Sequence, residues 1–107
     1  MAGHAVSSLV VLVTRGRRSG REHAVTLRTV LDDDGRYYFS RRRPNSDWFK
    51  NALYHGAADI IVDGGRISGS VDAVTDKDTI RRISMLKYAD AAKASIPRVA
   101  IRVTPRM

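Results

Sequence analysis

Residues 8–14 read SLVVLVT, and residues 15–20 directly after them read RGRRSG. The first segment is a continuous apolar run rich in β-branched side chains, which is typical of a strand buried on both faces. Two glycines, Gly16 and Gly20, then permit a compact polar turn. Residues 23–31 alternate apolar and polar side chains, which predicts a second, half-buried strand. This stretch therefore predicts two strands joined by a short basic turn.

More strands and turns follow. Asp34-Gly35 tolerates the positive φ angles of a type I′ hairpin turn, and the short aromatic run 37–39 after it predicts a third strand that ends at Ser40. The later strands are expected over residues 58–62, 66–74 and 99–103. Gly69, inside the fifth strand, indicates a bulge or a close approach of two backbones.

Two helices interrupt the strands. Ser46 or Asp47 can cap the first helix, which Gly56 ends. Thr75 is expected to cap the second helix, which runs to about Asp90. In 107 residues this order favours a small, mainly antiparallel barrel with flanking helices, in a single domain over residues 1–107.

The composition and the length of the apolar runs predict the cellular compartment of the protein. Its longest apolar run, residues 9–13, is far shorter than the ~20 residues that span a bilayer, and residues 1–4 show no secretory leader. We therefore expect no integral membrane association. The chain has no cysteine, which fits a reducing cytoplasm and excludes a thiolate nucleophile.

The charge points to an anionic partner. Nineteen Lys and Arg against eleven Asp and Glu give a formal net charge of +8. Nucleic acid, an acidic membrane surface, and a phosphorylated or polycarboxylate ligand all fit such an excess. The arginines gather in two clusters, Arg15, Arg17, Arg18 and Arg21, and then Arg41, Arg42 and Arg43. Their planar guanidinium groups suit phosphate and carboxylate geometry.

No motif supplies an obvious catalytic group. The turn 16–20 lacks the spacing of a Walker A or dinucleotide-binding loop, and the three histidines lack the spacing of metal ligands, so no metal site is expected. The turn suits phosphate or carboxylate, although a solvated basic hairpin explains it equally well. Trp48 is more readily a core anchor than a platform for a planar ligand. An enzyme built on this chain needs a cofactor to supply its chemistry.

An ordered series of these segments resembles the deazaflavin-dependent nitroreductase family. The resemblance covers about residues 8–105 and rests on residues 12–20, Leu27, Asp34-Gly35, residues 38–41, residues 48–51 and residues 64–66. Members of that family are split β-barrels related to pyridoxamine-phosphate-oxidase-like flavoproteins. The resemblance implies a mainly β (α+β) fold, a six-stranded antiparallel split β-barrel of the FMN-binding type with two flanking helices. It also implies a homodimer that binds coenzyme F420.

The resemblance also implies a set of cofactor-binding residues. They are Arg17, Arg18, Ser19, His23, Thr26, Ser40, Arg41, Trp48 and Asn51. The basic turn and the pair after the third strand would hold the phosphate and the acidic tail of the coenzyme, and Trp48 would lie by its ring system. His23 departs from the Arg or Thr usual in the family, and proline is usual near Thr26. Tyr88 is a candidate for contact with the substrate, whereas the catalytic residues are not identified.

The leading hypothesis is an oxidoreductase that transfers hydride between reduced F420 and a small organic acceptor of the quinone, nitro or enone type, without a nucleophile of its own. An alternative keeps the fold but binds FMN, as an oxidoreductase or a flavin-binding protein. A relative that carries the cofactor without turnover is also compatible with the sequence. A different class, a basic nucleic-acid-binding β-barrel, would use the arginines on phosphates and aromatic side chains for stacking, but those side chains occupy positions typical of a core.

Overall fold

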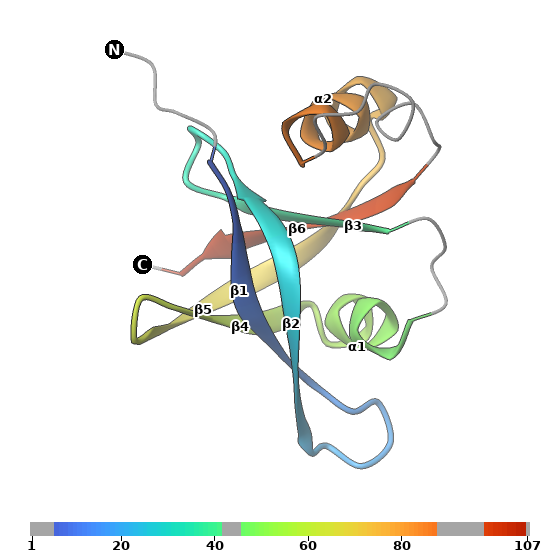
Figure 1. Cartoon of the computed structure of the whole chain (residues 1–107). Helices are drawn as coiled ribbons and strands as arrows, with labels where there is room; N and C mark the ends of the chain where they lie inside the picture. The colour runs from blue at the N-terminus through green and yellow to red at the C-terminus, as the bar shows by residue number, and fades with distance from the viewer. Residues whose placement is uncertain (1–5, 42–45, 88–97, 107) are drawn as a thin grey trace.

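The computed structural model describes residues 6–41, 46–87 and 98–106, which form a closed six-stranded antiparallel barrel with two helices (Figure 1). The strands are β1 (Val6–Arg15), β2 (Glu22–Leu31), β3 (Tyr37–Arg41), β4 (Ala57–Val62), β5 (Gly65–Val74) and β6 (Val99–Pro105), and the helices are α1 (Asp47–His55) and α2 (Lys77–Lys87). The order around the barrel is β1-β2-β3-β6-β5-β4, and β4 pairs with β1 to close it. The predicted mainly β class, element order and antiparallel barrel are confirmed.

The main core fills the inside of the barrel. Alternation along β1 points Val10 and Leu12 inward, where they join buried side chains from the other strands. Helix α1 adds Phe49 and Ala52 to the same cluster, so its apolar face packs into the barrel. This packing fixes the start of α1 beside the turn between β1 and β2, the two segments that form the site described below (Figure 1).

A second, smaller core lies between the barrel and α2. Ile83 of α2 packs with Val30, Tyr38 and Val74, which the strands present to the helix. The Arg82 guanidinium donates two hydrogen bonds, of 3.0 and 2.6 Å, to the carboxylate of Asp32 in the turn after β2. These bonds lower the pKa of Asp32 below its usual range, although burial acts in the opposite direction.

Strand β1 is less buried than its sequence predicts. The strand over residues 8–14 is expected to be covered on both faces, but Leu9 on the outer face is 62% exposed. Val13 on the same face is buried, and ion pairs from Arg66 to Glu22 and Asp59 cross the barrel surface beside it. In a barrel the inner face of a strand is always covered, whereas the outer face is covered only where another element lies on it.

Of the two Asp-Gly turns, one differs from expectation. The type I′ geometry lies at Asp63-Gly64, where both residues have positive φ (52° and 75°) between the paired residues Val62 and Gly65. At Asp34-Gly35 only the glycine has positive φ, so the prediction of a type I′ turn there is wrong. That turn is longer by one residue and is closed by a 3.0 Å hydrogen bond from the amide of Gly35 to the carbonyl of Asp32.

The cap of α2 lies one residue later than predicted. Asp76, and not Thr75, accepts hydrogen bonds from the Asp78 amide at 3.2 Å and the Thr79 hydroxyl at 2.6 Å. Ser46 precedes α1 in extended conformation but makes no side-chain cap bond.

Gly69 shows the close approach that its position in β5 predicts. A Cβ atom there would lie 2.6 Å from Cγ1 of Val103 and 2.9 Å from the carbonyl oxygen of Thr104. Strands β5 and β6 therefore pack together only with glycine at this point. Within the described ranges, neither helix is long and apolar enough to cross a membrane.

Candidate functional site

A cleft of about 640 Å³ opens between the β1–β2 turn, the adjoining part of β2 and the start of α1. We call it the Trp48 cleft. It is lined by Gly16, Arg17, Arg18, Ser19, His23, Val25, Asp47, Trp48 and Asn51. The structure thus brings together most of the site residues expected from the sequence, from segments about 30 positions apart in the chain.

The turn at the edge of the cleft is held by its own hydrogen bonds. The amide of Gly16 donates to the carbonyl of Arg21 at 2.9 Å, and the amide of Gly20 donates to the carbonyl of Gly16 at 3.1 Å. The Ser19 hydroxyl accepts from the Arg21 amide at 3.2 Å, and the Arg15 guanidinium donates to the Gly20 carbonyl at 3.1 Å. The backbone of the turn is therefore organised before a ligand binds, which lowers the entropic cost of binding.

Gly16 gives two polar side chains room to converge. A Cβ atom at this position would lie 2.6 Å from Oγ of Ser19 and 3.1 Å from Nε2 of His23. From the other side, Nε2 of His55 at the end of α1 lies 3.3 Å from the Gly16 carbonyl oxygen. The Ser19 hydroxyl and the His23 imidazole therefore both lie close to Gly16 in the lining of the cleft. There each of them can form a hydrogen bond with an anionic oxygen.

Two side chains of α1, those of Asn51 and Asp47, hold Arg17 in the cleft. Its Nη1 donates to Oδ1 of Asn51 at 2.7 Å, and its Nη2 lies 3.8 Å from the carboxylate of Asp47. Asn51 is only 4% exposed, so this bond satisfies a buried acceptor. Arg18 lines the same cleft, and among the described residues it has no ion-pair or hydrogen-bond partner for its side chain.

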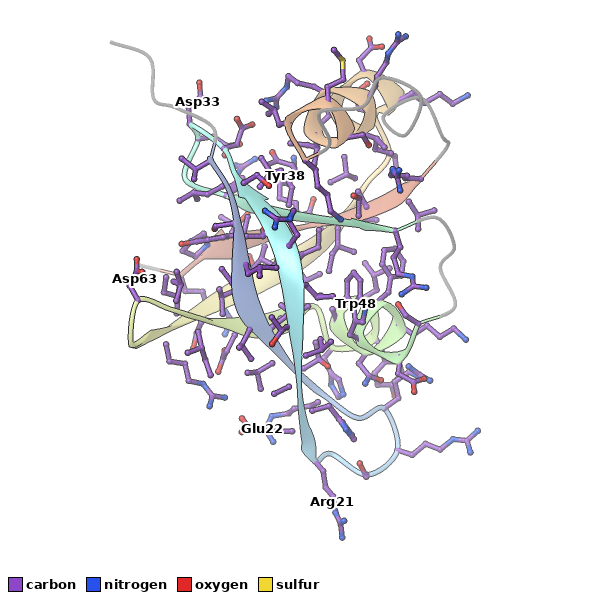
Figure 2. All side chains as sticks on the ribbon, in the orientation of Figure 1. Arg21, Glu22, Asp33, Tyr38, Trp48 and Asp63 are labelled. Atoms are coloured by element: carbon purple, nitrogen blue, oxygen red, sulfur yellow. The ribbon has the colours of Figure 1, made fainter. Side chains whose placement is uncertain are left out.

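Trp48 combines the two roles weighed from the sequence. Its ring makes edge-to-face contacts with Phe39, at 6.3 Å between centroids, and with Phe49, at 5.7 Å, which anchor it on the main core. It remains partly exposed and lines the cleft beside Val25. Figure 2 shows it on the side of α1 that faces the barrel. The cleft therefore has an apolar floor beside a cationic edge.

Three predicted site residues lie outside the cleft. Thr26 is exposed and shares the outer face of the barrel with its pairing partner Val11. Ser40 is buried, and its hydroxyl has no hydrogen-bond partner among the residues that the structure describes. Its carbonyl accepts a 3.2 Å hydrogen bond from Lys87 of α2. Arg41 is half-buried at the end of β3. Arg42, Arg43 and Tyr88 lie outside the described residues.

Sequence reasoning did not assign Val25 or Asp47 to the site, and it considered Gly16 only as part of the basic turn 16–20. Val25 has the ordinary pattern of a half-buried strand residue, and Asp47 is fully explained locally as an acidic residue at a helix start. No local signal marks either as a ligand contact. Only the folded arrangement brings Asp47 next to Arg17.

The cleft is suited to binding and less to protein-borne catalysis. Its guanidinium groups and hydroxyl favour an anionic group, and Trp48 with Val25 favours a flat apolar one. Within residues 6–41, 46–87 and 98–106, no three His, Asp or Glu side chains come close enough to hold a metal ion. A ligand with a planar ring and an acidic substituent fits both parts of the cleft.

Comparison with known proteins identifies the fold. No protein-family model and no curated protein matches the sequence. Among solved structures, an F420H2-dependent reductase, FDR-A, is similar with a TM-score of 0.70 and 13% identity, over 90% of this chain and 93% of that one. A protein described as a domain-swapped dimer has a TM-score of 0.72 and 14% identity, over 90% and 79%.

A third solved structure is also similar to this chain. It is a candidate pyridoxamine 5′-phosphate oxidase from Listeria innocua, with a TM-score of 0.67 and 15% identity, over 92% of this chain and 84% of that one. At such identities the likeness shows the shared architecture. The chain has the split β-barrel fold found in F420H2-dependent reductases and pyridoxamine-phosphate-oxidase-like proteins.

Proposed function

We propose that the chain is an oxidoreductase that binds the deazaflavin coenzyme F420 in the Trp48 cleft. One observation carries the proposal: the cleft joins a partly exposed tryptophan to Arg17, Arg18 and Ser19 on a preorganised turn. The similarity of the fold to an F420H2-dependent reductase supports the same coenzyme.

The residues present fit such a coenzyme. The volume of about 640 Å³ lies within the roughly 300–1,000 Å³ of small-molecule and cofactor sites. Trp48 and Val25 offer an apolar surface to the ring system, and the basic turn offers donors to the phosphate. Arg41 lies on the same face of β3 as Phe39, whose ring contacts Trp48, so we propose Arg41 as the contact for the acidic tail.

The chain's own contribution is to bind, orient and desolvate. The deazaflavin supplies the carbon that carries hydride, which relieves the protein of providing a nucleophile. Trp48, which is fixed by two aromatic neighbours, would orient the ring system, and Arg17 and Arg18 would hold the phosphate. The acceptor that we propose is a small organic molecule of the quinone, nitro or enone type.

We also propose that the protein works as a cytoplasmic homodimer. The similarity to a domain-swapped dimer supports the association of two copies. Sedimentation or light scattering of the purified chain measures this directly, and a mass of about 12 kDa at micromolar concentration would contradict it.

FMN is the second candidate. The similarity to a candidate pyridoxamine 5′-phosphate oxidase supports FMN, because this chain and that protein share one fold. Two arginines line the cleft and Arg41 lies at the end of β3, which favours the coenzyme whose negative charge is divided between a phosphate and an acidic tail. Single-stranded nucleic acid is less well supported, because Tyr37 and Tyr38 are buried and offer no stacking surface.

Equilibrium titration of the intrinsic fluorescence tests these alternatives. The protein contains a single tryptophan, so quenching reports on the Trp48 cleft. Saturable quenching by F420 at micromolar concentration, with FMN weaker, would support the proposal. Tighter binding of FMN than of F420 would identify FMN as the cofactor instead. No response to either coenzyme, with salt-sensitive binding of short DNA, would overturn the proposal.

A further inference from the structure

One residue of the Trp48 cleft has the wrong sign for an anion site. The carboxylate of Asp47 lies 3.8 Å from Nη2 of Arg17 and lines the cleft beside Arg18 and Trp48. Its side chain is 90% exposed, so burial does not force it against the arginine. Asp47 therefore lies close enough to Arg17 to repel an anion that binds to this guanidinium.

The charged side chains that line the cleft determine how strongly it binds anions of different charge. Arg17 and Arg18 contribute two positive charges, Asp47 removes one, and His23 is the remaining titratable group in the lining. With a neutral imidazole, the cleft therefore holds a net charge of one. A doubly charged ligand group feels twice the repulsion from Asp47 that a singly charged group feels, so Asp47 offsets part of the advantage that the two arginines give a dianion.

We propose that Asp47 tunes the charge specificity of this cleft: it weakens the binding of doubly charged anionic groups, such as a phosphate monoester, more than that of singly charged ones, such as a phosphate diester or a carboxylate. This inference deepens the proposed function and rests on it for the anionic nature of the ligand. It also bears on the choice of coenzyme, because FMN carries a phosphate monoester.

The reason is that Coulomb energy scales with the product of the two charges. Removing the charge of Asp47 relieves a dianion of twice the repulsion energy felt by a monoanion. The gain in affinity for the dianion is therefore the square of the gain for the monoanion. If removal of the charge strengthens monoanion binding by about threefold, it strengthens dianion binding by about tenfold.

The alternative role for Asp47 is structural. It is the first residue of α1, where a carboxylate interacts favourably with the helix dipole. A purely structural role predicts a change in the stability of the protein and, at most, an equal change in affinity for all anions. The ratio of the affinities for two anions separates the two roles.

Sulfate and methanesulfonate are suitable probes. Both present tetrahedral sulfonyl oxygens, one carries two charges and the other one, and neither changes charge near neutral pH. Binding is followed through the backbone amide NMR signals of Gly16 and Ser19, at constant ionic strength and at pH 8, where imidazoles are largely neutral. The variant is Asp47→Asn. The control is Asp33→Asn, which changes the net charge equally but lies in the turn between β2 and β3, away from Trp48 (Figure 2).

We expect Asp47→Asn to strengthen sulfate binding by about tenfold and methanesulfonate binding by about threefold, and Asp33→Asn to leave both within about 1.5-fold, because the two sites are separated by solvent and salt. Equal changes for the two anions, or none, would overturn the inference. The probes contain no coenzyme, so this result stands apart from the proposed function, which fails separately if neither F420 nor FMN binds.

Discussion

The Arg17 guanidinium donates a 2.7 Å hydrogen bond to Oδ1 of Asn51, which joins the β1–β2 turn to α1 across the Trp48 cleft. Asn51 is nearly fully buried, and its oxygen already accepts from Arg17. We therefore regard Asn51 as a positioning residue that acts on a ligand through Arg17, although the sequence resemblance implies direct contact with the coenzyme.

The first prediction tests this coupling. Arg17→Gln should weaken F420 binding by about tenfold, because it removes one charge-assisted hydrogen bond. Asn51→Ala should weaken binding by about threefold to tenfold, because it leaves the guanidinium unfixed. The double variant should bind no more weakly than Arg17→Gln alone, and fluorescence titration of all three variants gives the coupling.

Asn51→Gln serves as the control, because its side-chain amide oxygen can still accept from Arg17 and the substitution adds no charge. It should retain more of the affinity than Asn51→Ala does. Strictly additive losses in the double variant would show that Asn51 contacts the ligand independently of Arg17.

The second prediction concerns the contact between β5 and β6. Gly69→Ala should lower the free energy of unfolding by about 1–3 kcal/mol, because the new methyl group meets Val103 and the Thr104 carbonyl at distances that real Cβ atoms do not adopt. Gly65→Ala, in the same strand, should change it by less than about 0.5 kcal/mol, since its nearest neighbour would be the Val62 carbonyl oxygen at 3.7 Å. Urea denaturation measures both, and equal stability of the two variants would contradict the close approach.

The third prediction follows from the lowered pKa of Asp32. A carboxyl group with a lowered pKa in the folded state stabilises the protein above its ordinary pKa of about 3.9, and this stabilisation is lost as the pH falls through the lowered value. Arg82→Gln removes the main cause and should cost about 1–2 kcal/mol at pH 7, a reduced figure because Arg82 is half exposed. The difference from the unsubstituted protein should shrink below about pH 4.

Arg81→Gln is the matched control for this effect. Arg81 is exposed on the same helix, and within the part of the chain that the structure describes it makes no ion pair. Its stability should therefore follow the pH dependence of the unsubstituted protein. The same loss of pH dependence in both variants would rule out a specific role for the Asp32–Arg82 bond.

The hairpins of the fold can be predicted because their signals are local. Alternation over residues 23–31 and the glycine-containing turns fix which strands are neighbours in the chain. The closure of the barrel depends instead on pairing of β1 with β4, for example Val11 with Ile61, which lie 50 positions apart. No local pattern encodes that pairing, and it follows from the order of elements and the need to cover strand edges.

The two Asp-Gly turns show the limit of a local signal. The same dipeptide gives a type I′ turn at residues 63–64 but not at residues 34–35, because the register of the flanking strands sets the number of loop residues. The site has the same limit. The basic turn and Trp48 each carry a chemical signal, whereas the contact of Arg17 with Asn51 and Asp47 depends on how α1 docks.

The last prediction separates the effect of a positive charge that lines the cleft from the effect of a positive charge on the same hairpin outside the cleft. Arg18 lines the Trp48 cleft, whereas Arg21 extends away from the tip of the same hairpin (Figure 2). Arg18→Gln should weaken F420 binding by about tenfold or more, because a charge-assisted hydrogen bond to the coenzyme is lost. Arg21→Gln changes the net charge equally but should weaken binding by less than about twofold. Raising the salt concentration should reduce the small effect of Arg21→Gln more than that of Arg18→Gln, because a direct contact is screened less than a distant charge. Equal losses of affinity in the two variants, measured by fluorescence titration, would mean that the arginines attract the coenzyme only through the overall positive field of the protein, and that the Trp48 cleft does not bind its acidic group.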